Sequence, residues 1–362
     1  MNNKIIITLV VVIVITLGVV WYGQKDSKAN PASGEPIKIG AVYAITGPAA
    51  KYGELSVQGI RDAARYFEEI TGQKVEVLVE DSAGDPKQGV SAATKLYNID
   101  QVEVVLVGTS AVSAAIAPVA ESTQKILISD AALLGLTRDK AYTFQNFMPS
   151  LASIATYINT QADWQKVAVV YINDEFGNVW SEKIKTDITS SKTVETYAFE
   201  KDTTDYRTQS LKIKQFDPQV VVVIGYGPAL NQVLADLELN QIEAPRIGYL
   251  ACTLPGVTSD TRFDLGGDYS YEYPLISVDR FGNWINKNSG QDNAFYTVAF
   301  ENALLALSAL SETNGTALEA KDYLETKAID GLWGEVKFNS DRVVNRELVL
   351  TQINNGECVP VK

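Results

Sequence analysis

The stretch GPAAKYGELSVQGIRDAARYFEE, residues 47–69, decides the fold because it joins a strand to a helix through a tight turn. It follows the apolar run 37–45, begins with two helix breakers, and then repeats apolar residues at helical spacing. An aromatic residue, Tyr52, stands at the mouth of this helix. If the same unit recurs, its loops meet at one edge of a parallel sheet, where open α/β sheets bind their ligands.

The strand, loop and helix unit does recur, in two series along the chain. Short apolar runs between helices are typical of parallel strands with right-handed crossovers. We therefore predict an α/β fold with two similar doubly wound lobes. The expected strands are 37–45, 74–82, 102–108 and 125–129, then 166–174, 193–200, 220–227 and 245–251. The expected helices are 53–70, 86–98, one that starts near Ser110, 177–189, 206–216 and 229–240.

The later part of the chain breaks this alternation. Residues 293–311 form a long helical pattern with an apolar face, whereas 331–340 and 347–356 have the pattern of antiparallel strands. A chain that builds one lobe, then another, and then adds further elements makes discontinuous lobes joined by a hinge of several crossings. We expect lobe 1 to comprise 37–147 plus 273–339 and lobe 2 to comprise 148–272 plus 340–362, with a ligand cleft between them.

The composition is that of a globular protein that lacks a residue many enzymes use. Of 362 residues, 46% are hydrophobic and 21% are charged, which excludes a disordered chain. Asp and Glu total 44 against 31 Lys and Arg, so we expect no nucleic-acid partner. There is no histidine, which removes the commonest general base and zinc ligand. We predict no enzymatic activity, no metal and no cofactor.

The first 36 residues differ in character from the rest. Residues 5–22 carry no charge, and as a helix they would reach about 27 Å, enough to cross a bilayer core. Ser27-Lys28-Ala29 has the small-x-small form that signal peptidases cut. Residues 1–22 are therefore predicted to be a membrane anchor or a signal peptide, and 23–36 a flexible tether. Either alternative places the rest of the chain outside the cytoplasm.

The two cysteines, Cys252 and Cys358, lie far apart and have no metal-ligand spacing. In an exported chain they can form a disulfide, and they can equally be two independent thiols. Their spacing does not decide between these alternatives.

Six stretches, in this order, resemble the type I extracytoplasmic solute-binding proteins, in particular the branched-chain amino acid (leucine/isoleucine/valine) binding group of ABC transporters. The resemblance covers about residues 36–340 and is most specific where GP..KYG is followed by D..GDPKQ. It implies two lobes that close on a small ligand by hinge motion, and a loaded, monomeric protein that docks on a membrane permease. The stretches are IKIGAVYAITGPAAKYGE, VEDSAGDPKQGVSAATKL, VEVVLVGTSAVSAAIAPVAES, KILISDAALLGLT, KVAVVYINDEFG and VVVVIGYGP.

The resemblance implies ligand-binding residues in lobe 1. Tyr52 matches a tyrosine that the family places at the rim of the cleft. Ser110, followed by Ala111, matches the serine at a helix start where the ligand carboxylate is held. Independently of the family, backbone N–H groups and the positive end of a helix attract an anion. Ala131 matches a backbone-carbonyl contact.

Aromatic residues complete the implied site. Phe176 falls where an aromatic residue closes the cleft from lobe 2, and Tyr226 matches a second tyrosine of that lobe. Phe295 matches an aromatic residue near the ligand side chain.

Two positions depart from the family pattern. Where amino-acid binders have a threonine that helps hold the amino and carboxyl groups, this chain has Leu133. Where a glutamate pairs with the ligand ammonium, it has Leu250. A buried, unpaired ammonium costs several kcal/mol, so these two leucines argue against a zwitterionic ligand. Asp130 is the nearby carboxylate that can replace the glutamate.

Each of these positions also has a purely structural interpretation. Tyr52 can be a surface turn residue, and Ser110 a plain helix cap. Phe176, Tyr226 and Phe295 can be core residues. Leu133 and Leu250 can be packing residues or the wall of an apolar pocket.

The leading functional prediction is a binding protein that captures a small amino-acid-like or apolar carboxylate for an ABC permease. The alternative is a membrane-tethered sensor or receptor ectodomain of the same fold. An enzyme is the third hypothesis, since without histidine it would need paired carboxylates or a Lys or Tyr base.

Overall fold

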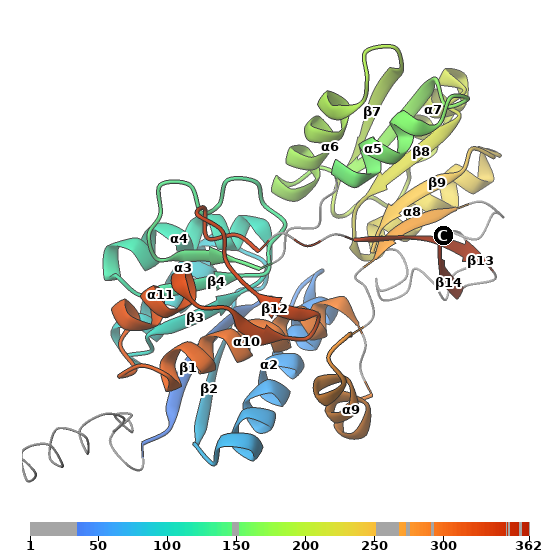
Figure 1. Cartoon of the computed structure of the whole chain (residues 1–362). Coiled ribbons are helices and arrows are strands. Elements are labelled where there is room, and N and C mark those ends of the chain that lie inside the picture. The colour runs from blue at the N-terminus through green and yellow to red at the C-terminus, as the bar shows by residue number, and fades with distance from the viewer. Residues whose placement is uncertain are drawn as a thin grey trace, which may run out of the picture. The chain divides into compact units, whose positions relative to one another are not determined.

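The computed structural model describes residues 35–146, 152–250, 268–272, 276–290, 293–344, 346, 348–354 and 357–361 (Figure 1). The predicted anchor or signal peptide, nearly all of the tether, and Cys252 lie outside the described residues.

The first sheet is fully parallel, with the strand order β2-β1-β3-β4-β5. Its strands are β1 Ile37–Tyr43, β2 Val75–Asp81, β3 Val104–Val107, β4 Ile126–Ser129 and β5 Thr143–Gln145. Side chains alternate between its two faces: Ile39, Ala41 and Tyr43 pack in one hydrophobic cluster, and Val42 packs in another. Apolar residues on both faces require helices on both sides of the sheet.

Helices α2 (Ala50–Thr71) and α10 (Ala294–Ser311) cover the first of these faces, and α3 (Pro86–Asn98) and α4 (Ser110–Thr123) cover the other. Helices α9 (Asp279–Asn288) and α11 (Ala317–Thr326) and the hairpin of β11 (Ile329–Gly331) and β12 (Gly334–Val336) pack in the same cluster as α2 and α10. Helix α10 is long and apolar enough to cross a membrane, but 83% of its apolar window is buried in this core.

The second sheet has the order β14-β13-β10-β9-β8-β6-β7. It is parallel from β10 to β7, and β13 and β14 add an antiparallel hairpin to its edge. Its strands are β6 Lys166–Ile172, β7 Thr193–Phe199, β8 Val220–Ile224, β9 Arg246–Tyr249, β10 Tyr269–Glu272, β13 Val349–Asn354 and β14 Glu357–Pro360. Its helices are α5 Ala152–Thr160, α6 Glu175–Asp187, α7 Arg207–Phe216 and α8 Gly227–Leu239.

The predicted α/β fold with two doubly wound parallel sheets is confirmed. The pattern missed the short strands β5 and β10 and the helices α5, α9 and α11. The chain passes from the first to the second sheet for the last time later than expected. Val344 still packs beside the first sheet and Val343 bridges Gln145, so the chain leaves this sheet after 344 rather than after 339. Cys358, in β14, is disulfide-bonded.

In both sheets, an aromatic residue at the carboxyl edge is followed by a glycine in the first turn of a helix. The first turn of α2 contains Tyr52-Gly53, and the first turn of α6 contains Phe176-Gly177. A Cβ atom on Gly53 would lie 2.0 Å from the Ala44 carbonyl oxygen, and one on Gly177 would lie 1.8 Å from a strand-end carbonyl oxygen. Only glycine lets the start of each helix approach its strand so closely.

Candidate functional site

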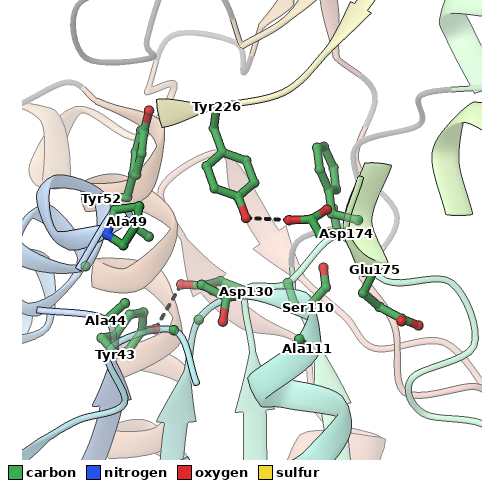
Figure 2. A pocket seen from close by; sticks show the side chains of 18 of the residues that line it. Tyr43, Ala44, Ala49, Tyr52, Ser110, Ala111, Asp130, Asp174, Glu175 and Tyr226 are labelled. Carbon is green, nitrogen blue, oxygen red and sulfur yellow. Dashed lines mark hydrogen bonds between the residues drawn. The ribbon is translucent and has the colours of Figure 1, made fainter. Parts of the chain in front are cut away.

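A cavity of about 390 Å³ lies where loops from the carboxyl ends of both sheets meet (Figure 2). Loops that follow β1, β2, β3 and β4, together with α2 and the start of α10, form what we call the first wall. Loops that follow β6, β7, β8 and β9 form the second wall. The first wall consists of Tyr43, Ala44, Pro48, Ala49, Tyr52, Gly53, Ser56, Ala83, Gly84, Asp85, Pro86, Gly108, Thr109, Ser110, Ala111, Asp130, Ala131, Ala132 and Phe295. The second wall consists of Asp174, Glu175, Phe176, Lys201, Gly225, Tyr226 and Tyr249.

The loop that carries Tyr52 is held in place by Asp81, the last residue of β2. One Asp81 carboxylate oxygen accepts hydrogen bonds from the backbone N–H groups of Ile45 at 3.0 Å and Ala83 at 2.7 Å. The other accepts from the Thr46 hydroxyl at 2.6 Å. Burial acts to raise the pKa of Asp81, but these bonds together lower it, so Asp81 stays ionised at neutral pH. The Gly-Pro turn is therefore fixed to the end of the neighbouring strand.

The start of α4 offers the first wall an anion-binding end. Ser110 is the first residue of this helix, is 7% exposed, and lines the cavity beside Ala111. No acidic side chain stands in the first turn, and no side chain caps the helix. Because the first N–H groups of a helix have no partner within the helix, this end carries a partial positive charge. It can hold a carboxylate.

Thr109, immediately before α4, has a strained backbone. Its φ of 65° with ψ of 140° lies where residues other than glycine rarely occur, at a cost of about 1–3 kcal/mol. Its hydroxyl is buried and has no hydrogen-bond partner in the described part of the chain. Strain and unpaired polar atoms gather at ligand sites, and both are found here at the edge of the cavity.

The loop after β4 is fastened through its carbonyl groups. The Gln145 side-chain amide donates to the carbonyl oxygens of Ala131 and Leu133. The Trp180 indole N–H, from α6 beside the second sheet, donates to the Ala132 carbonyl oxygen at 2.6 Å. Gln145 is itself bound through its backbone to Arg342 and Val344. This loop thus joins the cavity to both sheets and to the place where the chain leaves the first sheet.

Asp130 lines the first wall, and its carboxylate accepts a hydrogen bond from the Tyr43 hydroxyl at 2.9 Å (Figure 2). Burial raises the pKa of Asp130 to about 7, although the bond from Tyr43 acts in the opposite direction. Burial and the neighbouring Asp130 also raise the pKa of Tyr43, which stays protonated. At neutral pH this carboxyl group is close to its midpoint.

The polar groups of the second wall are bonded to one another. Asp174 caps α6 by accepting from the Gly177 N–H at 2.9 Å, and it also accepts from the Tyr226 hydroxyl at 2.5 Å (Figure 2). Lys201 lies 3.5 Å from the same carboxylate. Burial, followed by the neighbouring carboxylate, raises the pKa of Tyr226. Glu175 is exposed in the first turn of α6.

Aromatic rings from both walls meet around Tyr52. Its ring centroid lies 4.9 Å from that of Phe295 and 6.0 Å from that of Tyr226. Phe176 packs on Tyr226 and on Tyr249, with ring centroids 6.4 Å and 5.7 Å apart. The Tyr52 hydroxyl accepts a hydrogen bond from the Gly227 N–H, at the start of α8, at 2.9 Å. Tyr52 therefore links the two walls directly.

The structure places seven of the nine predicted site residues on this cavity. They are Tyr52, Ser110, Ala111, Ala131, Phe176, Tyr226 and Phe295. Leu133 and Leu250 do not line it. Leu133 packs in the cluster beneath α3 and α4, and Leu250 is fully buried in the core of the second sheet. Their neighbours Ala132 and Tyr249 face the cavity instead, so the structure favours the packing interpretation of the two leucines over the pocket-wall interpretation.

The sequence prediction missed several polar residues that line the cavity. Tyr43 and Tyr249 are the last residues of parallel strands, and Asp174 follows a strand closely, whereas Asp130 had been singled out from the sequence. Their signal was available, because ligand-binding side chains of open α/β sheets cluster where strands end. Among the described residues, no group of three or more Cys, Asp or Glu side chains is arranged to hold a metal ion.

A family model for periplasmic binding proteins matches residues 36–357, which include every strand except most of β14 and every residue of the cavity. The chain belongs to this family. Among curated proteins, the Leu/Ile/Val-binding protein of Escherichia coli K12 is similar to this chain, at 25% identity over 57% of this chain and 59% of that protein. The Leu/Ile/Val-binding protein BraC3 of Rhizobium johnstonii is 27% identical over 58% of this chain and 61% of that protein. The match thus spans about three fifths of the length of these relatives.

Solved structures of other binding proteins have the same fold. The substrate-binding protein LivJ of Streptococcus pneumoniae, in complex with isoleucine, gives a TM-score of 0.80 at 21% identity over 90% of this chain and 98% of that chain. A solute-binding protein of Rhodopseudomonas palustris, in complex with benzoate, gives 0.79 at 16% identity over 90% and 96%. The predicted type I fold is confirmed.

Proposed function

We propose that this periplasmic binding protein is the extracytoplasmic substrate-binding component of an ABC transporter and captures a small carboxylate. The observation that carries the proposal is the uncapped start of α4, with Ser110 and Ala111, in a cavity between two sheets. The cavity volume of about 390 Å³ lies within the range of small-molecule sites.

The ligands of similar proteins support a carboxylate. Isoleucine, benzoate, 4-hydroxybenzoate and 3,4-dihydroxybenzoic acid are named for the similar structures, and all four carry one. In this chain the carboxylate lies at the start of α4, the Tyr52 ring covers it from the rim, and Phe176 and Tyr226 enclose the rest of the ligand. The two sheets close on the ligand by hinge motion, and the loaded monomer delivers it to a membrane permease.

Thermal unfolding of the purified chain tests this function. The panel contains leucine, isoleucine, valine, phenylalanine, their des-amino counterparts, benzoate and 4-hydroxybenzoate. A ligand at about 100 times its dissociation constant adds about 2.7 kcal/mol to the free energy of unfolding, which raises the melting temperature. Small-angle X-ray scattering of the same samples measures closure as a decrease in the radius of gyration. If no carboxylate raises the melting temperature, the proposed capture function is wrong.

A further inference from the structure

Glu301, an acidic residue of α10, is fully buried and lies outside the cavity. One of its carboxylate oxygens accepts a hydrogen bond from the Leu332 N–H at 2.8 Å. The other accepts from the Asn146 side-chain amide at 2.9 Å and from the Arg346 guanidinium. A Cβ atom on Gly331 would lie 2.2 Å from the first oxygen, so a glycine leaves the space that this carboxylate occupies. Both oxygens of the buried acid are therefore in use.

The two side chains that donate to Glu301 belong to segments by which the chain passes between the sheets. Asn146 directly follows β5, and the described chain resumes in α5, which packs with the second sheet. Val344 still packs beside the first sheet, whereas β13 of the second sheet begins at Val349. Arg346 therefore lies on the last passage between the sheets. A single side chain of α10 thus binds two of these passages at once.

Further contacts fix the orientation of this cluster. The Asn146 amide also donates to the Asn302 side-chain oxygen at 2.8 Å, and the Arg346 guanidinium lies 4.6 Å from the centre of the Trp333 ring. The side chains of Arg346 and Glu301 are 12% and 0% exposed. Because desolvation offsets most of the attraction between buried charges, such a pair adds little net stability. What it can supply is a preference for one arrangement of the segments that it joins.

The same passages are connected to the cavity through Gln145, the neighbour of Asn146. The Gln145 side-chain amide donates to the carbonyl oxygen of Ala131, which lines the cavity in the loop after β4. The Gln145 backbone N–H donates to the Arg342 carbonyl oxygen at 2.9 Å, on the segment that leads to the last passage. An unbroken series of bonds therefore runs from the ligand loop to Glu301.

We propose that Glu301 is a positioning residue for closure of the two walls. Its bonds to Asn146 and Arg346 stabilise the arrangement of the two passages in which the walls meet, and they thereby set how long the ligand is held. The inference goes beyond the proposed function, and only its measurements with ligand rest on that function.

Glu301 acts without touching the ligand. It lies six residues after the cavity-lining Phe295, which is about 9 Å along α10. The arrangement that contains its bonds is the one in which the Tyr52 hydroxyl accepts from the Gly227 N–H across the walls. A ligand enters while the walls are apart, so losing the Glu301 bonds should leave the association rate unchanged. The ligand leaves when the walls separate, so dissociation should become faster.

The test measures ligand association and dissociation by stopped-flow tryptophan fluorescence on the variants Glu301→Gln and Arg346→Lys of the full chain. The probes are the carboxylates of the thermal-unfolding panel, L-isoleucine and benzoate first. We expect dissociation to be at least about tenfold faster in Glu301→Gln, with association changed by less than about twofold. Arg346→Lys keeps the charge but loses the planar contact with Trp333, so we expect a smaller increase in dissociation. If Glu301→Gln does not fold, Arg346→Lys carries the same test.

Asp62→Asn is the matched control. Asp62 is an acid of α2 that is 5% exposed and accepts from the Arg65 guanidinium at 2.6 Å and the Tyr296 hydroxyl at 2.9 Å. It therefore pairs with an arginine as Glu301 does, but within the helices of the first sheet. Asp62→Asn should lower the melting temperature and leave both rates unchanged, which a role of Glu301 in stability alone would not distinguish from Glu301→Gln.

Hydrogen exchange of the empty chain, followed residue by residue with NMR, gives a readout that needs no ligand. The Gly227 N–H is bonded across the walls, whereas the amides of β8 are bonded within the second sheet. Glu301→Gln should speed exchange at Gly227 relative to β8, and Asp62→Asn should not.

The outcomes separate the inference from the proposed function. Unchanged dissociation in a folded Glu301→Gln chain, or equal increases in Glu301→Gln and Asp62→Asn, overturns the inference and leaves capture of a carboxylate intact. If no carboxylate of the panel binds the unchanged chain, the proposed function is wrong, and exchange at Gly227 decides the inference. Equal exchange at Gly227 in Glu301→Gln and the unchanged chain then overturns it.

Discussion

The two walls of the cavity are built alike but present different chemistry. Each begins with a strand, a turn and an aromatic-glycine pair, Tyr52-Gly53 on the first wall and Phe176-Gly177 on the second. On the second wall, Asp174 already satisfies Tyr226, Lys201 and the start of α6. On the first wall, the start of α4 has no cap and Asp130 has no cation among the described residues.

Under the proposed function, this difference gives the two walls different tasks. The first wall has the unpaired polar groups that a charged ligand head requires, and its loops are fixed by Asp81 and Gln145. The second wall contributes rings that enclose an apolar body. Binding of the charged head to the first wall, followed by closure of the second, is the order that this arrangement favours.

The largest expected effect is on the free energy of unfolding, and it tests the aromatic-glycine pair that the two walls share. Gly53→Ala and Gly177→Ala each place a Cβ atom about 2 Å from a carbonyl oxygen. Each should lower the free energy of unfolding by about 3 kcal/mol, as measured by urea denaturation. Gly282→Ala, in α9, is the control, because its nearest neighbours lie 3.7 Å away and alanine favours a helix. If either variant had an unchanged free energy of unfolding, the claim that both walls depend on the same glycine contact would be wrong.

A smaller effect tests how the walls differ in charge. Because burial raises the pKa of Asp130 to about 7, the folded state favours its protonated form, and stability is lost as the pH rises from about 4 to about 7. Asp130→Asn should therefore raise the free energy of unfolding of the empty protein at pH 8, by about 2 kcal/mol. Asp174→Asn should lower it, because this residue caps α6. If both variants changed the free energy of unfolding in the same direction, the claim that the two walls differ in how their acids are paired would be wrong.

The smallest effect concerns the contact between the walls. Tyr52→Phe removes the hydroxyl that accepts from the Gly227 N–H but keeps the ring. Losing one such bond costs about 1 kcal/mol, so affinity for L-isoleucine should fall about fivefold, as measured by calorimetry. Tyr206→Phe is the control, because its hydroxyl bonds within the second sheet, to the Tyr197 carbonyl oxygen. Equal affinity losses in both variants would mean that the Tyr52 bond has no special part in closure.

The sequence predicted the elements that have a strong period. All eight expected strands are present, and so is α10. Short, continuous apolar runs indicate buried strands, and a long apolar pattern at helical spacing indicates a buried helix. The misses are short or weakly patterned. The strands β5 and β10 have three and four residues, too few to show a period, and tertiary packing rather than pattern defines them.

The candidate site was predictable where a backbone signal was present. Tyr52 and Ser110 sit beside a turn and at a helix start, which the sequence shows directly. The family pattern pointed to Leu133 and Leu250, whereas the residues that line the cavity are their neighbours Ala132 and Tyr249. An error of one residue at the end of a strand moves a side chain from the cavity to the core, and the sequence alone does not fix that register.

The claim that the first wall recognises the charged part of the ligand is tested most directly by neutralising one acid on each wall. The matched variants are Asp130→Asn on the first wall and Glu175→Gln on the second. Calorimetric titration with L-isoleucine at pH 8 compares each with the unchanged chain. Affinity should fall at least about tenfold in Asp130→Asn and less than about twofold in Glu175→Gln, because Asp130 is half-buried without a cation partner among the described residues, whereas Glu175 is exposed. Equal losses, or a larger loss in Glu175→Gln, would contradict the assignment of ligand recognition to the first wall.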